Sequence, residues 1–90
     1  MEENPLKIKN YRGYKFLSIV LNLDAFQKRF GVKKELMLEC GKGQDYDVNV
    51  IRKVLNKIYP NHYLVRYIDT GNQYNDYFMI YTKWGEIKYV

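Results

Sequence analysis

The residue types that most often carry catalysis are scarce in this chain of 90 residues. It holds one cysteine and one histidine, Cys40 and His62, which lie 22 positions apart and lack the close spacing of metal ligands. A nucleophilic thiolate–imidazole pair would require the fold to bring the two together, whereas a lone cysteine commonly serves as a small core residue. The sequence therefore predicts no catalytic residue, no metal site and no cofactor, and we expect a protein that is not an enzyme.

Two short patterns contain residue types found in phosphate and metal chemistry. Residues 41–43, Gly-Lys-Gly, lack the length of a phosphate-binding loop and its following serine or threonine, so they predict a turn. Residues 86–88, Glu-Ile-Lys, could join Asp69 or Asp76 around Mg²⁺ as in metal-dependent nucleases. Alternating charge on a terminal edge strand gives the same pattern, because charges protect an edge from aggregation. We expect the edge-strand explanation to hold.

Basic residues are concentrated near the start of the chain. The net charge is +5, and residues 4–34 hold eight basic residues against one acid, Asp24, which gives that segment a charge of +7 (8 − 1). Such a segment attracts a polyanion, and we expect nucleic acid, with DNA favoured. A solvated lysine surface without a partner would have the same composition. The expected nucleic-acid-binding residues are Lys7, Lys9, Arg12, Lys15, Lys28, Arg29, Lys33 and Lys34.

Tyrosine is unusually frequent, with ten copies in the chain. Tyrosine rings can stack on bases or form part of a protein contact. They also pack well on a pleated sheet, which is the simpler explanation. The tyrosines that we select for possible stacking or partner contact are Tyr63, Tyr67, Tyr77 and Tyr81.

The composition also bears on compartment and assembly. The longest uncharged run, residues 16–23, has eight residues, far fewer than the roughly 20 that a membrane-spanning helix needs, so we expect no membrane partner. A single cysteine fits a reducing compartment, which predicts a cytoplasmic protein, or one in the host cytoplasm if it is phage- or virus-encoded. A chain this short buries only about 60–65% of its unfolded surface, so we expect a homodimer.

The second half of the chain has the clearest pattern. Residues 47–59 predict an amphipathic helix, with Asp45 or Asp47 at its start and Pro60 after its end. Residues 62–70, 74–83 and 86–90 predict an antiparallel meander of two or three strands. The first of these strands is apolar on both faces, which is typical of a central or doubly covered strand.

The first half is ambiguous, because residues 14–30 fit one long helix as well as a strand followed by a short helix. The β-branched Ile19 and Val20 favour a strand, and Asp24 is a natural N-cap for a helix over residues 25–30 that ends at Gly31. Residues 32–40 fit either a strand or a helix.

We expect a single α+β domain over residues 1–90, with an antiparallel sheet, the helix 47–59 and the short helix 25–30. Its halves would be a basic strand–helix–strand unit, residues 6–40, and a helix with a β-meander, residues 45–90. The alternative is a winged helix, with residues 48–58 as the recognition helix and residues 70–74 near the tip of the wing.

Residues 7–40 resemble the swapped-hairpin DNA-binding domain of AbrB-like regulators and MazE-type antitoxins. That pattern has a strand, a glycine-containing turn, a second strand, a short helix ending in Leu-Gly-Ile, two polar residues and a final strand. Here the turn is Arg12-Gly13, the Leu-Gly-Ile positions are residues 30–32, and the polar pair is residues 33–34. Leu23 stands where the family has proline, and Glu35 where it has glycine.

The resemblance implies an intertwined homodimer that lays its basic strand–turn surface on DNA. It would place Lys7, Lys9, Arg12 and Lys15 against phosphates or base edges. The sequence therefore predicts a small DNA-binding protein, a transcriptional regulator. One alternative is a phage- or virus-encoded protein that inhibits a host protein or ribonucleoprotein. Another is RNA or single-strand binding through the sheet tyrosines.

Overall fold

Seven elements of secondary structure make up the part of the chain that the structure describes, residues 10–43, 46–71 and 76–85 of a computed structural model. The mixture of helices with one antiparallel sheet confirms the predicted α+β class. In chain order the elements are β1 (Asn10–Tyr11), β2 (Tyr14–Val20), α1 (Leu23–Phe30), α2 (Lys34–Gly41), α3 (Asp47–Ile58), β3 (Tyr63–Ile68) and β4 (Tyr77–Thr82).

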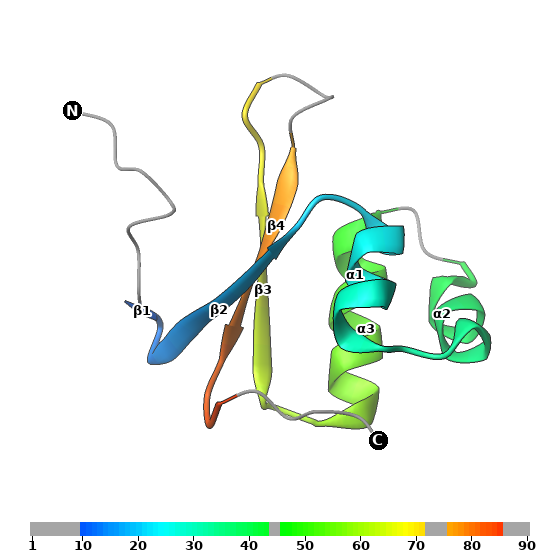
Figure 1. The fold of residues 1–90 in the computed structure, drawn as a ribbon, viewed down its shortest axis with the longest axis horizontal. Coiled ribbons are helices and arrows are strands. Elements are labelled where there is room, and N and C mark those ends of the chain that lie inside the picture. Colours follow the sequence, from blue (N-terminus) through cyan, green and yellow to red (C-terminus); the bar gives the residue numbers. More distant parts are fainter. Residues whose placement is uncertain (1–9, 44–45, 72–75, 86–90) are drawn as a thin grey trace.

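The strands pair in the order β1–β2–β4–β3, and the three helices lie together on one side of this sheet (Figure 1). β4 is central between β2 and β3, and residues 78–82 of it are buried. Of the two predictions for residues 62–70, the central strand is wrong, because β3 is an edge strand. Both faces of β3 contact apolar layers: Val65 packs into the core under the helices, and Leu64 pairs with the buried Tyr81 of β4 on the opposite face.

The β1–β2 hairpin turns at Arg12 and Gly13, whose φ angles are 52° and 84°. Two successive positive φ angles define the type I′ turn, whose twist suits a two-residue hairpin. Glycine takes such an angle without strain, whereas arginine does so at some cost. The predicted strand over residues 7–9 lies outside the described residues.

Helix α1 begins two residues earlier than predicted. Its N-cap is Asn22, whose side-chain oxygen accepts a hydrogen bond from the backbone N–H of Ala25 at 2.8 Å. Asp24, the predicted cap, instead lies in the first turn, where its carboxylate meets the positive end of the helix dipole. Gly31 ends the helix in the left-handed conformation, with φ of 64°, as predicted.

Residues 32–40 contain helix α2 and not the final strand that the strand–helix–strand half requires. Lysine, glutamate, leucine and methionine over residues 34–39 are all good helix formers. Burial follows helical spacing, because Leu36, Met37 and Cys40 face the core whereas Leu38 is 66% exposed. A strand would have placed Leu38 on the same face as Leu36 and Cys40. The winged-helix alternative requires residues 14–30 as well as residues 32–40 to be helical, but residues 14–20 form β2. Three helices nevertheless precede the final β3–β4 hairpin, as in that alternative.

Helix α3 spans Asp47–Ile58 and confirms the amphipathic helix predicted at residues 47–59. Its N-cap is Tyr46, which makes no side-chain capping bond, and Asp47 lies in the first turn. The buried side of α3 is the centre of a core shared with β2, β3, β4, α1 and α2. Each buried apolar side chain contributes roughly 1.5–3 kcal/mol, so this layer fixes α3 against the sheet. The α3 residues in it are Val50, Ile51, Val54 and Leu55.

Candidate functional site

The six chosen basic residues that the structure describes do not gather on one surface. Figure 1 shows the β1–β2 hairpin, which carries two of them, at one edge of the sheet, and the α1–α2 connection on the side covered by the helices. These six residues are exposed, which is compatible with phosphate contact and equally with a solvated surface. Lys7 and Lys9 lie outside the described residues, Arg12 and Lys15 are in the hairpin, and Lys28, Arg29, Lys33 and Lys34 surround the connection.

The four selected tyrosines are divided between the two faces of the sheet. Tyr63 and Tyr67 share the face of Val65, which is covered by the helices, whereas Tyr77 and Tyr81 point to the other face. Tyr67 is the most exposed of the four, at 46%. These tyrosines therefore do not form a single stacking surface.

Tyr81 is fully buried, so the prediction that it contacts a base or a partner is wrong. Its hydroxyl accepts a hydrogen bond from Nη1 of Arg66 at 3.2 Å. Its ring centroid lies 5.5 Å from that of Tyr11 and 6.0 Å from that of Phe16. The guanidinium of Arg66 in turn lies 4.1 Å from the Tyr11 ring centroid. Tyr81 is thus the buried centre of a second aromatic layer, on the sheet face opposite the helices. This agrees with the interpretation that the tyrosines pack on the sheet.

A basic groove of about 480 Å³ lies between α3 and the edge strand β3. Lysine, arginine and asparagine side chains of α3 provide its polar lining, and β3 provides an aromatic ring and two aliphatic side chains. Among the residues that line it there is no acid. We name it the α3–β3 groove, and it is lined by Asn49, Arg52, Lys53, Leu55, Asn56, Tyr63, Leu64 and Val65.

Arg52 is held in place at this groove by the backbone of β3. Its Nε and Nη2 donate hydrogen bonds to the carbonyl oxygen of Val65 at 3.3 and 3.0 Å. These bonds satisfy a backbone acceptor at the edge of the sheet, a place where unpaired groups invite unwanted strand pairing. They also fix the guanidinium plane, and Nη1 makes no hydrogen bond within the described ranges.

The exposed side of α3 is a stripe of polar residues that extends past the groove. Spacings of three and four residues place its members on one helix face. Three of them are cations, two are amides and none is an acid. The sequence predicts this polar side of the amphipathic helix, and the winged-helix alternative makes residues 48–58 the recognition helix, but these residues are not among the selected nucleic-acid-binding residues. We name this side the α3 stripe, and it consists of Asn49, Arg52, Lys53, Asn56 and Lys57.

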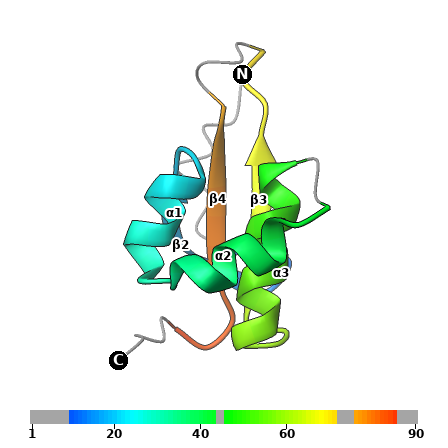
Figure 2. The ribbon, with the colours of Figure 1, turned by 90° about the vertical axis from the view of Figure 1, so that its right-hand side faces the viewer.

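One member of the stripe links α3 to α2. Nζ of Lys57 lies 2.8 Å from Oε1 of Glu39. The hydrogen bond to Lys57 lowers the pKa of Glu39 below its usual value, and the same bond raises the pKa of Lys57. Both groups therefore stay charged around neutral pH, and the ion pair links the exposed sides of α3 and α2, which crosses in front of α3 in Figure 2.

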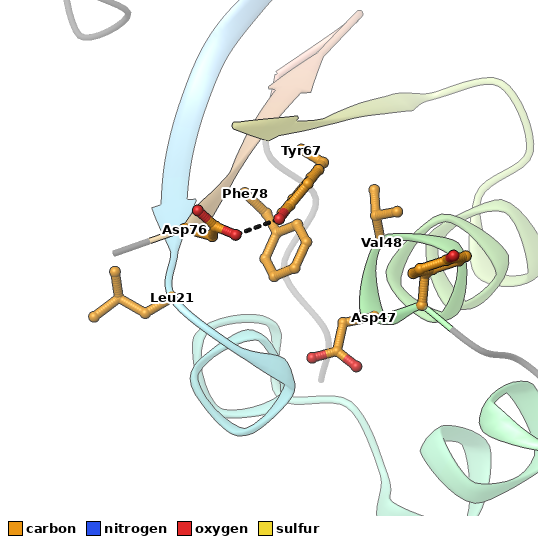
Figure 3. Close-up of a pocket in the computed structure, with 7 residues that line it drawn as sticks. Leu21, Asp47, Val48, Tyr67, Asp76 and Phe78 are labelled. Atoms are coloured by element: carbon orange, nitrogen blue, oxygen red, sulfur yellow. Dashed lines mark hydrogen bonds between the residues drawn. The ribbon is translucent and has the colours of Figure 1, made fainter. Parts of the chain in front are cut away.

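A second hollow, of about 390 Å³, has the opposite character. Figure 3 shows Tyr67 and Phe78 of the sheet facing Val48 and Asp47 at the start of α3. The Tyr67 hydroxyl donates a hydrogen bond to the carboxylate of Asp76. We name this hollow the acidic pocket, and it is lined by Leu21, Tyr46, Asp47, Val48, Tyr67, Asp76 and Phe78.

The hydrogen bond between Tyr67 and Asp76 shifts the pKa of both groups. It is the main cause that raises the pKa of Tyr67 to about 12. The same bond, helped by the backbone N–H of Thr70 at 3.1 Å, lowers the pKa of Asp76. Asp76 is therefore an oriented carboxylate that stays ionised at neutral pH.

Cys40 and His62 occupy structural positions. Cys40 is fully buried in the core cluster, as the sequence suggested. Nε2 of His62 lies 2.7 Å from the carbonyl oxygen of Gly85, and since a carbonyl only accepts, Nε2 carries the hydrogen. Within the described residues, no group of three or more His, Cys, Asp or Glu side chains is placed to hold a metal ion. The acid–lysine pattern at residues 86–88 lies outside those residues.

Comparisons with protein-family models, with curated proteins and with solved structures found no match to this chain. The resemblance to swapped-hairpin domains therefore stays a prediction, although its final strand is replaced here by α2. The homodimer, the cytoplasmic location and the nucleic-acid partner also stay predictions. In the described ranges no helix has the length and apolar character needed to cross a membrane.

Proposed function

We propose that this protein binds double-stranded DNA through the α3 stripe and acts as a transcriptional regulator. The observation that carries the proposal is the α3–β3 groove, which has two cations, two amides and no acid among its lining residues. The proposal keeps the DNA partner expected from the sequence but moves its main contacts from residues 7–34 to α3.

The side chains of the stripe suit both kinds of DNA contact. An α-helix fits the major groove, which is about 12 Å wide. Arg52, Lys53 and Lys57 can neutralise phosphates, which supplies most of the affinity of such interfaces. Asparagine is the usual partner of adenine, so Asn56 is the candidate for a base contact.

The position of α3 in the fold supports the same function. α3 comes directly before the β3–β4 hairpin, and α2 crosses it (Figure 2). In the winged-helix alternative these elements are the recognition helix, the wing and the helix before the recognition helix. The tip of the hairpin, residues 72–75, lies outside the described residues. The cations around the α1–α2 connection, which lies on the same side of the sheet as α3, would then add secondary phosphate contacts, whereas Arg12 and Lys15 would not.

An NMR titration tests where DNA binds. Uniformly ¹⁵N-labelled protein is titrated with a mixed-sequence duplex at low salt, where non-specific binding is strongest. We expect the largest amide shifts at residues 49–57 and at Tyr63. Shifts confined to residues 12–15 or 28–34 would overturn the assignment to α3. The absence of any saturable shift would overturn DNA binding itself and favour the alternative of a protein that binds a host factor. Sedimentation velocity on the same sample tests the predicted homodimer.

A further inference from the structure

The acidic pocket is the feature of the molecule that DNA binding does not explain. It opens between the β2–α1 turn, the start of α3 and the facing residues of β3 and β4 (Figure 3). We infer that it binds a small organic cation with an apolar body, of the arylalkylammonium class. This inference does not depend on the proposed function, because the acidic pocket and the α3–β3 groove share no lining residue.

Charge selects a cation. The chain as a whole has 15 basic and 10 acidic residues, yet the charged side chains that line the acidic pocket are two carboxylates, Asp47 and Asp76, without a lysine or arginine. DNA and other polyanions are repelled from such a site, whereas an ammonium group is attracted to it.

The two carboxylates are arranged differently. Asp76 is held by the Tyr67 hydroxyl and by the N–H of Thr70, so its orientation is fixed before any ligand arrives. Asp47 projects from the first turn of α3, and within the described residues it has no ion-pair partner. Asp76 thus offers an ammonium group an oriented hydrogen-bond acceptor, and Asp47 adds a second negative charge to the lining.

The rest of the lining suits an apolar, aromatic body. The rings of Tyr67 and Phe78 lie 5.6 Å apart between centroids, at 38° to one another. Rings placed beside carboxylates attract organic cations through cation–π contacts. Leu21 and Tyr46, also in the lining, are 65% and 69% exposed. These large apolar groups stand at the mouth of the pocket, where a bound ligand would cover them.

The size of the acidic pocket selects a small molecule. About 390 Å³ lies within the range of roughly 300–1,000 Å³ that is usual for small-molecule sites. An arylalkylammonium ion places its ring among the aromatic side chains and its charge at a carboxylate of the lining.

A matched pair of probes isolates the role of charge. Phenethylammonium and phenethyl alcohol have the same apolar body and differ in the charged end. In ¹H–¹⁵N NMR titrations we expect phenethylammonium to shift the amides of residues 21, 46–48, 67 and 76–78. We expect the alcohol to bind at least tenfold more weakly. Equal affinity for the two probes, shifts at other residues, or no saturation by about ten millimolar would each overturn the inference.

Variants test the carboxylates directly. Asp47→Asn should weaken phenethylammonium binding at least fivefold, and because Asp47 makes no ion pair with another described residue, the variant should fold normally. Asp76→Asn should have a larger effect, and its amide spectrum shows whether the β3–β4 hairpin is intact. Val48→Phe should block the site while it leaves both carboxylates in place. Glu35→Gln, which removes an exposed acid from α2, is the control, and a loss equal to that of Asp47→Asn would contradict a local site.

Discussion

The double substitution R52Q/K53Q gives the sharpest test of the α3 stripe. Both residues are exposed and line the α3–β3 groove. Each cation that neutralises a phosphate contributes about −0.9 to the slope of log affinity against log salt concentration. If both residues touch phosphates, the double variant should lose about 1.8 from the magnitude of that slope. Between 50 and 200 mM salt, the affinity of the wild type should then fall about tenfold more than that of the variant.

Fluorescence anisotropy with a labelled duplex, repeated over a salt series, measures this slope. The matched control is K33Q/K34Q, which removes the same charge from the start of α2. Its slope should change by less than half as much, because these lysines lie on the α1–α2 connection and not on the stripe. An unchanged slope for R52Q/K53Q, or a larger change for K33Q/K34Q, would refute α3 as the DNA-binding element.

Two further predictions concern stability and titration. Gly31→Ala should destabilise the protein by about 1 kcal/mol, because a side chain at φ of 64° is strained even where space is open; an unchanged thermal midpoint would contradict this. In ¹³Cζ-tyrosine NMR, the resonance that Tyr67→Phe removes should titrate at about 12, and Asp76→Asn should move it towards its usual value of 10.0. Since folding raises the pKa of Tyr67, the stability of this pair is present below pH 10 and is lost as the pH rises through about 12.

Folding shifts the pKa of Asp76, the carboxylate of the same pair, in the opposite direction to that of Tyr67. Folding lowers the pKa of Asp76, so its contribution to stability is present above the unfolded value and is lost as the pH falls through the folded one. Titration of either group therefore weakens the Tyr67–Asp76 hydrogen bond, at high pH through Tyr67 and at low pH through Asp76.

The sequence predicted elements well wherever local chemistry decided them. The amphipathic period of residues 47–58 and the left-handed Gly31 are local signals, and both are confirmed. Residues 32–40 could not be assigned from sequence, because their residue types favour a helix whereas the alternation of apolar and polar residues favours a strand. The answer depended on α3, which offers α2 a surface for Leu36, Met37 and Cys40. The cap at Asn22 rather than Asp24 was likewise a choice between two good caps two residues apart.

The two hollows could not be predicted because each joins residues far apart in the chain. The α3–β3 groove depends on β3 lying at the edge of the sheet. The sequence of β3 is apolar on both faces, which suggested a strand at the centre of the sheet. The acidic pocket joins the β2–α1 turn to the starts of α3 and β4. Net charge indicated a basic protein but could not show that an acidic site lies beside a basic one.

Arg52 has both a structural role at the edge of the sheet and a proposed role in DNA binding. Two of its nitrogen atoms cover the Val65 carbonyl at the edge of the sheet, so the side chain is ordered before DNA arrives. Ordering a long side chain in advance removes an entropy cost of about 0.5–1.5 kcal/mol from binding. Lys53 is also exposed but makes no such bond within the described residues. Substitution of Arg52 alone should therefore weaken both the sheet edge and DNA binding, whereas substitution of Lys53 should affect binding without a change in stability.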